Sequence, residues 1–174
     1  MKISHVTIAL INPKSVTNVG AVMRAAGCYR VDAVIYSGSR YDRAAKMQTD
    51  TKDRRQTIPL TGVDDLLAAI PANAKVVCVE LAEGAIPLPD YHHPDNAVYV
   101  FGPEDGTISQ AIIDRAGAVV YVPTVGCMNL AASVNVVLYD RLAKSVLTTA
   151  GDELIRESRD TNNAVRVKSV SNKA

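Results

Sequence analysis

Four polar side chains lie beside apolar runs, where they could bind or orient a substrate: Asn18, Arg24, Glu104 and Asn129. Arg24 is a poor base, because the pKa of an arginine lies above about 12 and its planar guanidinium is better suited to binding anions. Gly20 costs about 1 kcal/mol relative to alanine inside a helix, so we expect its backbone to approach another group closely. Plain structural explanations also exist: Arg24 as a surface residue, Asn18 as a helix cap, and Glu104 as an exposed carboxylate in a turn.

The stretch from residue 118 to 142 predicts a strand, a loop and a long helix. The β-branched and aromatic run at 119–122 is typical of a buried strand, which Pro123 ends because proline lacks a backbone donor. From Asn129, apolar residues recur every three or four positions, and we expect this helix to end near Ala150. A strand, a short loop and a helix in succession often frame a small-molecule site.

Strand-like and helix-like segments alternate along the rest of the chain. We predict strands over residues 5–11, 31–36, 57–60, 75–81 and 96–101. We predict helices over residues 18–26 with Thr17 or Asn18 as the cap, 42–48, 63–70, and 110–115 with Ser109 as the cap. The alternation favours an α/β fold, a mainly parallel sheet with helices on both faces, in one domain over residues 1–150. Residues 151–174 are polar without a sustained period, which predicts a flexible tail.

Composition and missing motifs exclude several classes of protein. The length of 174 residues and a hydrophobic fraction of 48% fit a globular domain, and the net charge of +1 does not decide about nucleic acid. Cys28, Cys78 and Cys127 are far apart, which predicts reduced thiols in the cytoplasm. The start of the chain lacks a signal-peptide pattern, and no apolar run approaches the roughly 18 residues that span a bilayer.

Neither G-x-G-x-x-G nor a P-loop is present, which disfavours a nucleotide-dependent dehydrogenase or an ATPase. The pair His92-His93 lacks a nearby cysteine or spaced carboxylate, so we interpret it as a surface loop and expect no metal site.

Three stretches resemble, in the right order, the motifs of the SPOUT methyltransferases of the SpoU/TrmH branch. The first comprises Asn12-Pro13 and residues 18–26, the second is FGPEDG at 101–106, and the third is VPT at 122–124 with CMNL at 127–130. Each motif is weak alone, but three in order over residues 5 to about 145 are specific. One departure is that the family usually has glycine at the position of Thr107, whereas this chain has Gly106. In this family the last segment threads through a loop as a trefoil knot.

The resemblance implies an S-adenosyl-L-methionine-dependent RNA ribose 2′-O-methyltransferase. It assigns Arg24 to activation of the ribose 2′-hydroxyl, and the high pKa of arginine favours phosphate binding and alkoxide stabilisation over proton removal. Asn18, Glu104 and Asn129 would complete the catalytic group. Cys127 stands where the family commonly has serine, so one hydroxyl contact is expected to be lost. The cofactor contacts implied by the family are Glu80, Leu81, Gly102, Val122, Cys127, Met128 and Leu130.

RNA contacts are expected from a basic segment, namely Arg40, Arg43, Lys52, Arg54 and Arg55. The short chain resembles the minimal family members that methylate tRNA, which favours tRNA over rRNA as the substrate. The helix from Asn129 to Thr149 carries more apolar residues than one buried stripe needs, so a leftover face with Tyr139 predicts the homodimer typical of the family. Two alternatives remain open. One is a non-catalytic RNA-binding or assembly protein that keeps the fold, and the other is a small-molecule α/β enzyme, which the missing nucleotide motifs disfavour.

Overall fold

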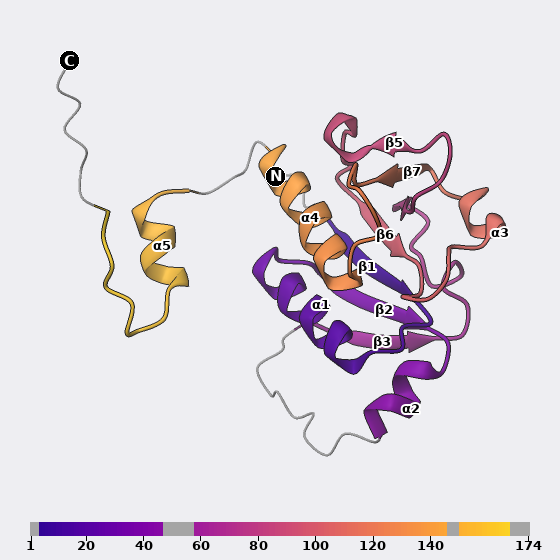
Figure 1. The fold of residues 1–174 in the computed structure, drawn as a ribbon, viewed down its shortest axis with the longest axis horizontal. Helices are drawn as coiled ribbons and strands as arrows, with labels where there is room; N and C mark the ends of the chain where they lie inside the picture. Colours follow the sequence, from indigo (N-terminus) through magenta and orange to yellow (C-terminus); the bar gives the residue numbers. More distant parts are fainter. Residues whose placement is uncertain (1–3, 47–57, 146–149, 168–174) are drawn as a thin grey trace. The chain divides into compact units, whose positions relative to one another are not determined.

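The computed structural model describes residues 4–46, 58–145 and 150–167. The chain forms two compact units, residues 1–144 and residues 145–174. The first unit contains the sheet and all three predicted motifs (Figure 1). The second contains a short helix, α5 (Asp152–Ser158). No helix in the described ranges is both long and apolar enough to cross a membrane.

Seven strands form one sheet in the order β3-β2-β1-β6-β4-β7-β5, and every neighbouring pair is parallel. The strands are β1 (Val6–Ile11), β2 (Ala33–Ser37), β3 (Leu60–Val63), β4 (Lys75–Val79), β5 (Ile86–Pro87), β6 (Ala97–Phe101) and β7 (Ala118–Tyr121). Because β1 lies beside β6, the loops that carry the first and second motifs emerge next to each other. The third motif follows β7, at the same edge of the sheet, where ligands of parallel α/β folds bind.

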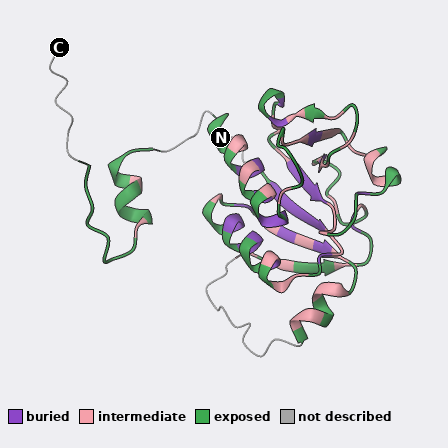
Figure 2. Cartoon of the chain, viewed as in Figure 1, coloured by how far each residue is buried: buried purple, intermediate pink, exposed green. Residues whose placement is uncertain are grey.

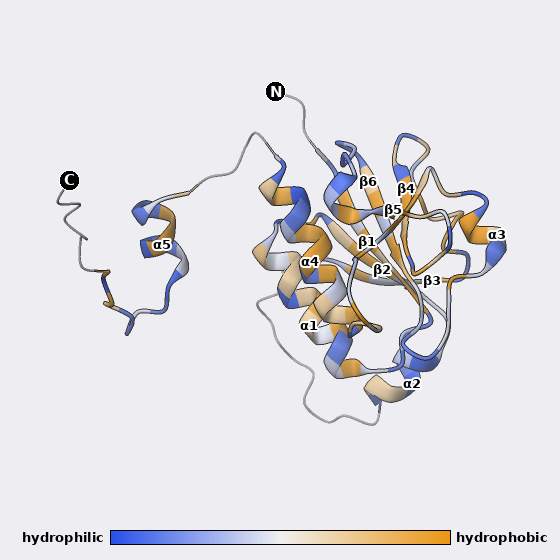
Figure 3. Cartoon of the chain, turned by 45° about the horizontal axis from the view of Figure 1, so that its top comes forward, coloured by the Kyte–Doolittle hydropathy of each residue, from blue (hydrophilic) through white to orange (hydrophobic). Residues whose placement is uncertain are grey.

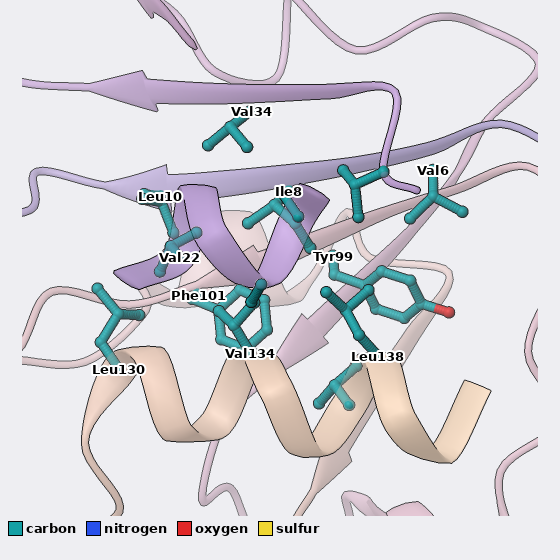
Figure 4. Close-up of a cluster of buried hydrophobic side chains, with 14 of the residues drawn as sticks. Val6, Ile8, Leu10, Val22, Val34, Tyr99, Phe101, Leu130, Val134 and Leu138 are labelled. Atoms are coloured by element: carbon teal, nitrogen blue, oxygen red, sulfur yellow. The ribbon is translucent and has the colours of Figure 1, made fainter. Parts of the chain in front are cut away.

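The helices of the first unit cover both faces of the sheet. They are α1 (Val16–Cys28), α2 (Arg40–Lys46), the short 3-10 helix η1 (Leu88–Asp90), α3 (Gln110–Ile113) and α4 (Leu130–Ala143). On one face, α1 and α4 lie side by side. Figure 4 shows their side chains Val22, Val134 and Leu138 beside the sheet residues Leu10, Phe101 and Tyr99, respectively. On the other face, the segment around α3 packs on a second buried cluster, which comprises Ala9, Leu66, Cys78, Val98, Val100 and Ile108. Burial is therefore concentrated in the central strands and the inner sides of α1 and α4 (Figure 2).

The structure confirms the predicted α/β class, the parallel sheet and helices on both faces. The trefoil knot stays a prediction. The strand prediction over 57–60 is displaced, since β3 begins at Leu60, and residue 57 lies outside the described residues. The short edge strand β5 was not predicted, because two residues cannot show an alternating pattern.

The predicted helix over residues 63–70 is wrong. Val63 pairs with Ser37 in the sheet, and the residues after it form only turns. Asp65 accepts the backbone N–H groups of Leu67 and Ala68 at 2.9 and 3.1 Å, as it would at a helix start. Pro71 follows one turn later and disfavours the helical conformation of the residue before it, so the turn is not extended.

Two boundaries in the C-terminal part also differ from prediction. Helix α4 ends at Ala143 rather than near Ala150. Directly after this end, the Lys144 ammonium donates a hydrogen bond to the carbonyl of Leu88 at 2.6 Å. Residues 152–158 of the predicted tail form α5, a helix that was not predicted, while the flexibility of the tail stays a prediction. Asp152 and Glu153 in its first turn favour a helix through their interaction with the helix dipole. Residues 168–174 of the predicted tail lie outside the described residues.

Candidate functional site

A cavity of about 170 Å³ lies at the carboxyl ends of β4, β6 and β7. The loop between β7 and α4 forms one wall, and the loop after β6 forms another. All seven residues predicted to contact the cofactor line it: Glu80, Leu81, Gly102, Val122, Cys127, Met128 and Leu130. The structure thus collects residues from three separate strand ends around one space, as the parallel topology requires. Their role toward a cofactor stays a prediction.

A chain of hydrogen bonds joins three of the predicted catalytic residues, Asn18, Glu104 and Asn129. The N–H groups of Ala131 and Ala132 donate to Asn129 Oδ1 at 2.9 and 3.3 Å, which makes Asn129 the N-cap of α4. Asn129 Nδ2 donates to Asn18 Oδ1 at 3.1 Å, and Asn18 Nδ2 donates to Glu104 Oε1 at 3.3 Å. The helix end requires an acceptor and the ionised carboxylate requires a donor, so each amide has only one favourable orientation.

Glu104, which also lines the cavity, fixes the loop that follows β1. Its carboxylate accepts the backbone N–H groups of Lys14 at 3.1 Å and Ser15 at 3.2 Å. Burial alone would raise the pKa of Glu104, but these hydrogen bonds and the one from Asn18 outweigh it and lower the pKa. Glu104 is therefore ionised at neutral pH, and it connects the first motif to the second.

The cap of α1 differs from prediction. Ser15 is the N-cap, because its hydroxyl accepts the N–H of Asn18 at 3.1 Å, and the helix continues to Cys28. The prediction that Thr17 or Asn18 caps the helix is wrong. Asn18 lies inside the first turn, which leaves its side chain to bridge Glu104 and Asn129. Ser109 does precede α3 as predicted, but its side chain makes no capping hydrogen bond.

Arg24 is separate from this network. It lies exposed on α1, and among the described residues it has no hydrogen-bonding or ion-pair partner. From Asn18 to Arg24 the helix rises about 9 Å. The exposed face of α1 also carries Gly20, where an added Cβ would meet no described atom within 4 Å. The close approach that we expected at Gly20 is therefore not made by the described part of a single protomer.

Thr107, which stands where the family usually has glycine, makes a specific contact with Glu80. Thr107 donates its hydroxyl to Glu80 Oε2 at 2.9 Å, and the Ile108 N–H donates to the same oxygen at 2.9 Å. Leu81 N–H donates to Glu80 Oε1 at 2.9 Å. Glu80 thus fastens the loop after β6 to the end of β4 beside the cavity. Sequence reasoning did not select Thr107, although a hydroxyl where the family usually has glycine was a visible signal.

A second group of charges lies where the first and second motifs meet. Arg40 Nη1 donates to Asp105 Oδ1 at 2.8 Å, and Lys14 Nζ lies 3.2 Å from Asp105 Oδ2. Hydrogen bonds from Arg40 and Lys14 lower the pKa of Asp105. Arg40 Nε also donates to the carbonyl of Asn12 at 2.9 Å. Arg40 therefore helps to hold the first-motif loop, a contact that its selection as an RNA-binding residue did not anticipate.

The other residues predicted to contact RNA are less constrained. Arg43 is exposed on α2. Three of them lie outside the described residues, namely Lys52, Arg54 and Arg55. The predicted role of this basic segment stays a prediction.

The interpretation of His92-His93 as a surface loop holds for the exposed His92 but is wrong for His93. The His93 side chain is only 4% exposed, with Nε2 2.8 Å from Asp140 Oδ2 and Nδ1 2.6 Å from the Tyr99 hydroxyl. Burial lowers the pKa of His93, although the hydrogen bond to Asp140 opposes this shift. His93 thus ties the loop before β6 to the second half of α4. In the described ranges, no group of three or more His, Cys, Asp or Glu residues could hold a metal ion.

Residues 5–139 match the SpoU rRNA Methylase family. A relative from Acinetobacter baylyi, the 23S rRNA (guanosine-2′-O-)-methyltransferase RlmB, is 29% identical over 132 residues. The match covers 71% of this chain and 53% of RlmB, so the chain spans about half the length of the curated relative.

Several solved structures share the fold. An AdoMet-bound rRNA methyltransferase from Sinorhizobium meliloti has a TM-score of 0.66 and 20% identity, over 82% of this chain and 57% of that chain. The A. aeolicus TrmH/SpoU tRNA modifying enzyme has a TM-score of 0.63 and 17% identity, over 79% and 74%. A protein studied for 2-OH methylation of C/U34 on tRNA has a TM-score of 0.68 and 20% identity, over 83% and 92%. At these identities the likeness establishes the fold.

Proposed function

The chain belongs to the SpoU rRNA Methylase family, and from this membership we propose that it is an AdoMet-dependent RNA ribose 2′-O-methyltransferase. The observation that carries the proposal is the cavity at the strand ends, with Glu104 in its wall and Asn18 and Asn129 joined to Glu104. A site for methyl transfer to RNA needs both a pocket for the methyl donor and polar groups that orient a ribose. The cavity would serve as the pocket, and Asn18, Glu104 and Asn129 would serve as the polar groups.

The cavity fits AdoMet by the chemistry of its walls. Leu81, Val122, Met128 and Leu130 provide apolar surface that can enclose an adenine ring, and the irregular loop after β7 brings backbone groups to its edge. An AdoMet-bound relative from S. meliloti shares the fold. When bound, the cofactor would supply a methyl group activated by a sulfonium. Glu80, held by three hydrogen bonds, would keep the two neighbouring walls in place.

Arg24 is best suited to stabilising negative charge during the reaction. Methyl transfer would join the ribose 2′ oxygen to the methyl group that AdoMet supplies, with the sulfur as the leaving group, and the hydroxyl proton would pass to water. A guanidinium can hold the neighbouring phosphate through two hydrogen bonds and stabilise the negative charge that develops on the oxygen. It would not remove the proton, because its pKa lies above about 12.

The exposed position of Arg24 favours a homodimer in which two chains complete each site. Helices α1 and α4 lie side by side, with their outer faces directed away from the sheet (Figure 3). On α4, Tyr139 and Leu142 are 62% and 40% exposed. A two-fold axis that packs these faces would bury the apolar residues and could bring Arg24 of the partner subunit to the cavity. The open space at Gly20 would permit close packing of a second backbone.

We favour tRNA as the substrate. The chain covers 92% of the protein studied for methylation of C/U34 on tRNA, but only 53% of the rRNA enzyme RlmB. The exposed Arg43 and the basic residues that follow α2 in sequence would contribute phosphate contacts.

Methyl transfer from labelled AdoMet to unmodified tRNA tests the proposal. Arg24→Ala should lower the transfer rate about 100-fold or more, the effect of losing one oxyanion-stabilising donor, while AdoMet binding by calorimetry stays near that of the wild type. Arg115→Ala, at an exposed arginine just before β7, is the matched control and should transfer normally. A wild-type chain that binds RNA but neither binds AdoMet nor transfers methyl groups would instead support the non-catalytic RNA-binding alternative.

A further inference from the structure

We propose that Lys14 and Arg40 form a binding site for a backbone phosphate of the RNA substrate, and that Asp105 occupies this site in the free protein. This inference rests on the proposed function, because the ligand is the substrate of that reaction. The two cations come from different elements, the loop after β1 and the start of α2, yet they converge on one carboxylate at 3.2 and 2.8 Å. Two cationic donors that converge on an anionic oxygen pair form the arrangement in which proteins hold phosphate.

Arg40 is the fixed member of this cluster, whereas the side chains of Lys14 and Asp105 are 49% and 48% exposed and can move. Arg40 Nε donates to the Asn12 carbonyl at 2.9 Å, so its guanidinium is held in place without Asp105. The Arg40 side chain is 24% exposed, while the Asp105 side chain is 48% exposed. Asp105 stands in an exposed turn, and its carboxylate has no other partner in the part of the chain that the structure describes. Rotation of one exposed side chain would therefore free both cations.

The position of the cluster connects it to the reaction. Asp105 directly follows Glu104, which lines the cavity, and the Lys14 N–H donates to Glu104 at 3.1 Å. A phosphate held by Lys14 and Arg40 would lie beside the cavity rather than on a remote surface, which would fix the register of the RNA chain. An exposed ion pair is weak in net terms, and a polyanion gains further affinity by releasing counterions, so RNA can displace the carboxylate.

Asp105→Asn tests the assignment, because it removes the competing charge and preserves the size of the side chain. The affinity for fluorescently labelled tRNA should rise about threefold to tenfold at low salt, and the slope of log affinity against log salt should steepen by about 1 to 2, as one or two cations become free. Adding Lys14→Ala to Asp105→Asn should remove much of the gain. Lys14 is the better second change, since Arg40 also holds the Asn12 carbonyl. Asp114→Asn, next to α3, changes the net charge equally and is the control that should leave affinity unchanged.

The possible results separate this inference from the proposed function. Equal affinity and equal salt slope for the wild type and Asp105→Asn would overturn the phosphate site and leave the methyltransferase proposal standing. An equal gain from Asp114→Asn would also overturn it, because bulk charge would then explain the effect. If neither protein binds tRNA, the phosphate site and the choice of tRNA both fail, and methyl transfer to rRNA then decides the methyltransferase proposal. Binding by Asp105→Asn alone would support the site and its occupation by Asp105.

Discussion

Replacing Asn129 by aspartate should separate the role of this residue in stability from its role in the site. Aspartate keeps the oxygen that accepts the N–H groups of Ala131 and Ala132, so α4 keeps its N-cap. The change replaces the Nδ2 group, which donates to Asn18 Oδ1 at 3.1 Å, with a second oxygen. Two acceptors would then face each other. Asn18 cannot relieve this by turning its amide over, because its own oxygen would then face Glu104.

The two consequences differ in size. A negative charge at the first turn of a helix contributes about 0.3–1 kcal/mol of stability, while an unsatisfied polar group costs about 1–3 kcal/mol if it stays buried and less if it rotates into water. Both side chains are partly accessible, so the net change in the free energy of unfolding should stay within about 1 kcal/mol, or about 2–4 °C in Tm. Displacement of Asn18 and Glu104 acts directly on the geometry of the site. If this costs about 1.4–2.8 kcal/mol in the transition state, the rate of methyl transfer falls about tenfold to 100-fold.

The assay compares Tm, AdoMet affinity and methyl transfer for Asn129→Asp and Asn135→Asp. Asn135 is an exposed asparagine on the same helix, whose Nδ2 donates to the Ala131 carbonyl at 2.8 Å, so its replacement makes the same chemical change outside the network. Because Asn135 is exposed on α4, whose outer face is proposed to pack in the dimer, light scattering should first show that both variants keep the wild-type oligomeric state. We then expect only Asn129→Asp to lose transfer. A wild-type rate for Asn129→Asp, at an unchanged Tm, would show that the orientation of these amides does not matter for the reaction.

Two other contacts lead to measurable expectations. Thr107→Val should weaken AdoMet binding about tenfold by calorimetry, because a hydrogen bond to a carboxylate contributes about 1.5–3 kcal/mol, whereas Thr107→Ser should bind normally; equal affinities would disprove the role of the bond to Glu80. The lowered pKa of His93 means that the unfolded chain takes up a proton more readily than the folded chain. The stability that neutral His93 provides is therefore present above about pH 6.5 and is lost as the pH falls through the folded-state pKa, so Tm should decrease between pH 7 and pH 5 in the wild type and less in His93→Gln. An identical pH dependence of Tm in the two proteins would contradict this assignment.

The sheet and the cavity could be predicted because both depend on repeated local patterns. Apolar runs located five of the seven strands, the run at 57–60 overlapped β3 only at Leu60, and parallel strands necessarily bring their carboxyl ends to one edge. The resemblance to the family selected Glu80, Gly102 and Cys127, and this rule explains why they surround one space although they are far apart in sequence. The shortest strand was missed for the same physical reason, since two residues carry no period.

Contacts between exposed side chains and short caps could not be predicted in this way. Ser15, Thr17 and Asn18 all have side chains that can cap a helix, and only the position of Glu104 leaves Ser15 as the cap and Asn18 as the bridge. The burial of His93 depends on Asp140, which lies almost fifty residues later in the chain. No local pattern encodes that pair.

The proposed dimer has a further consequence that follows from helix geometry. Asn18 and Arg24 lie on the same helix, but six residues at about 100° each place their side chains about 120° apart around its axis. Asn18 faces its own Glu104, so Arg24 points away from the network that its own chain completes. If the proposed dimer forms, each cavity would use the network of one chain and Arg24 of the partner subunit.

Mixing two variants of low activity therefore tests whether the sites are shared. In a heterodimer of Arg24→Ala and Asn129→Asp, one cavity would combine the intact network of the first chain with the intact arginine of the second, and the other cavity would carry both defects. After random exchange of subunits about half of the dimers are mixed, and each has one intact site, so activity should recover to about a quarter of the wild-type value. Exchange can be verified with chains that carry different tags. If mixed dimers form and the activity does not recover, each chain uses its own Arg24, and α1 must then move to bring this arginine to the cavity of its own protomer.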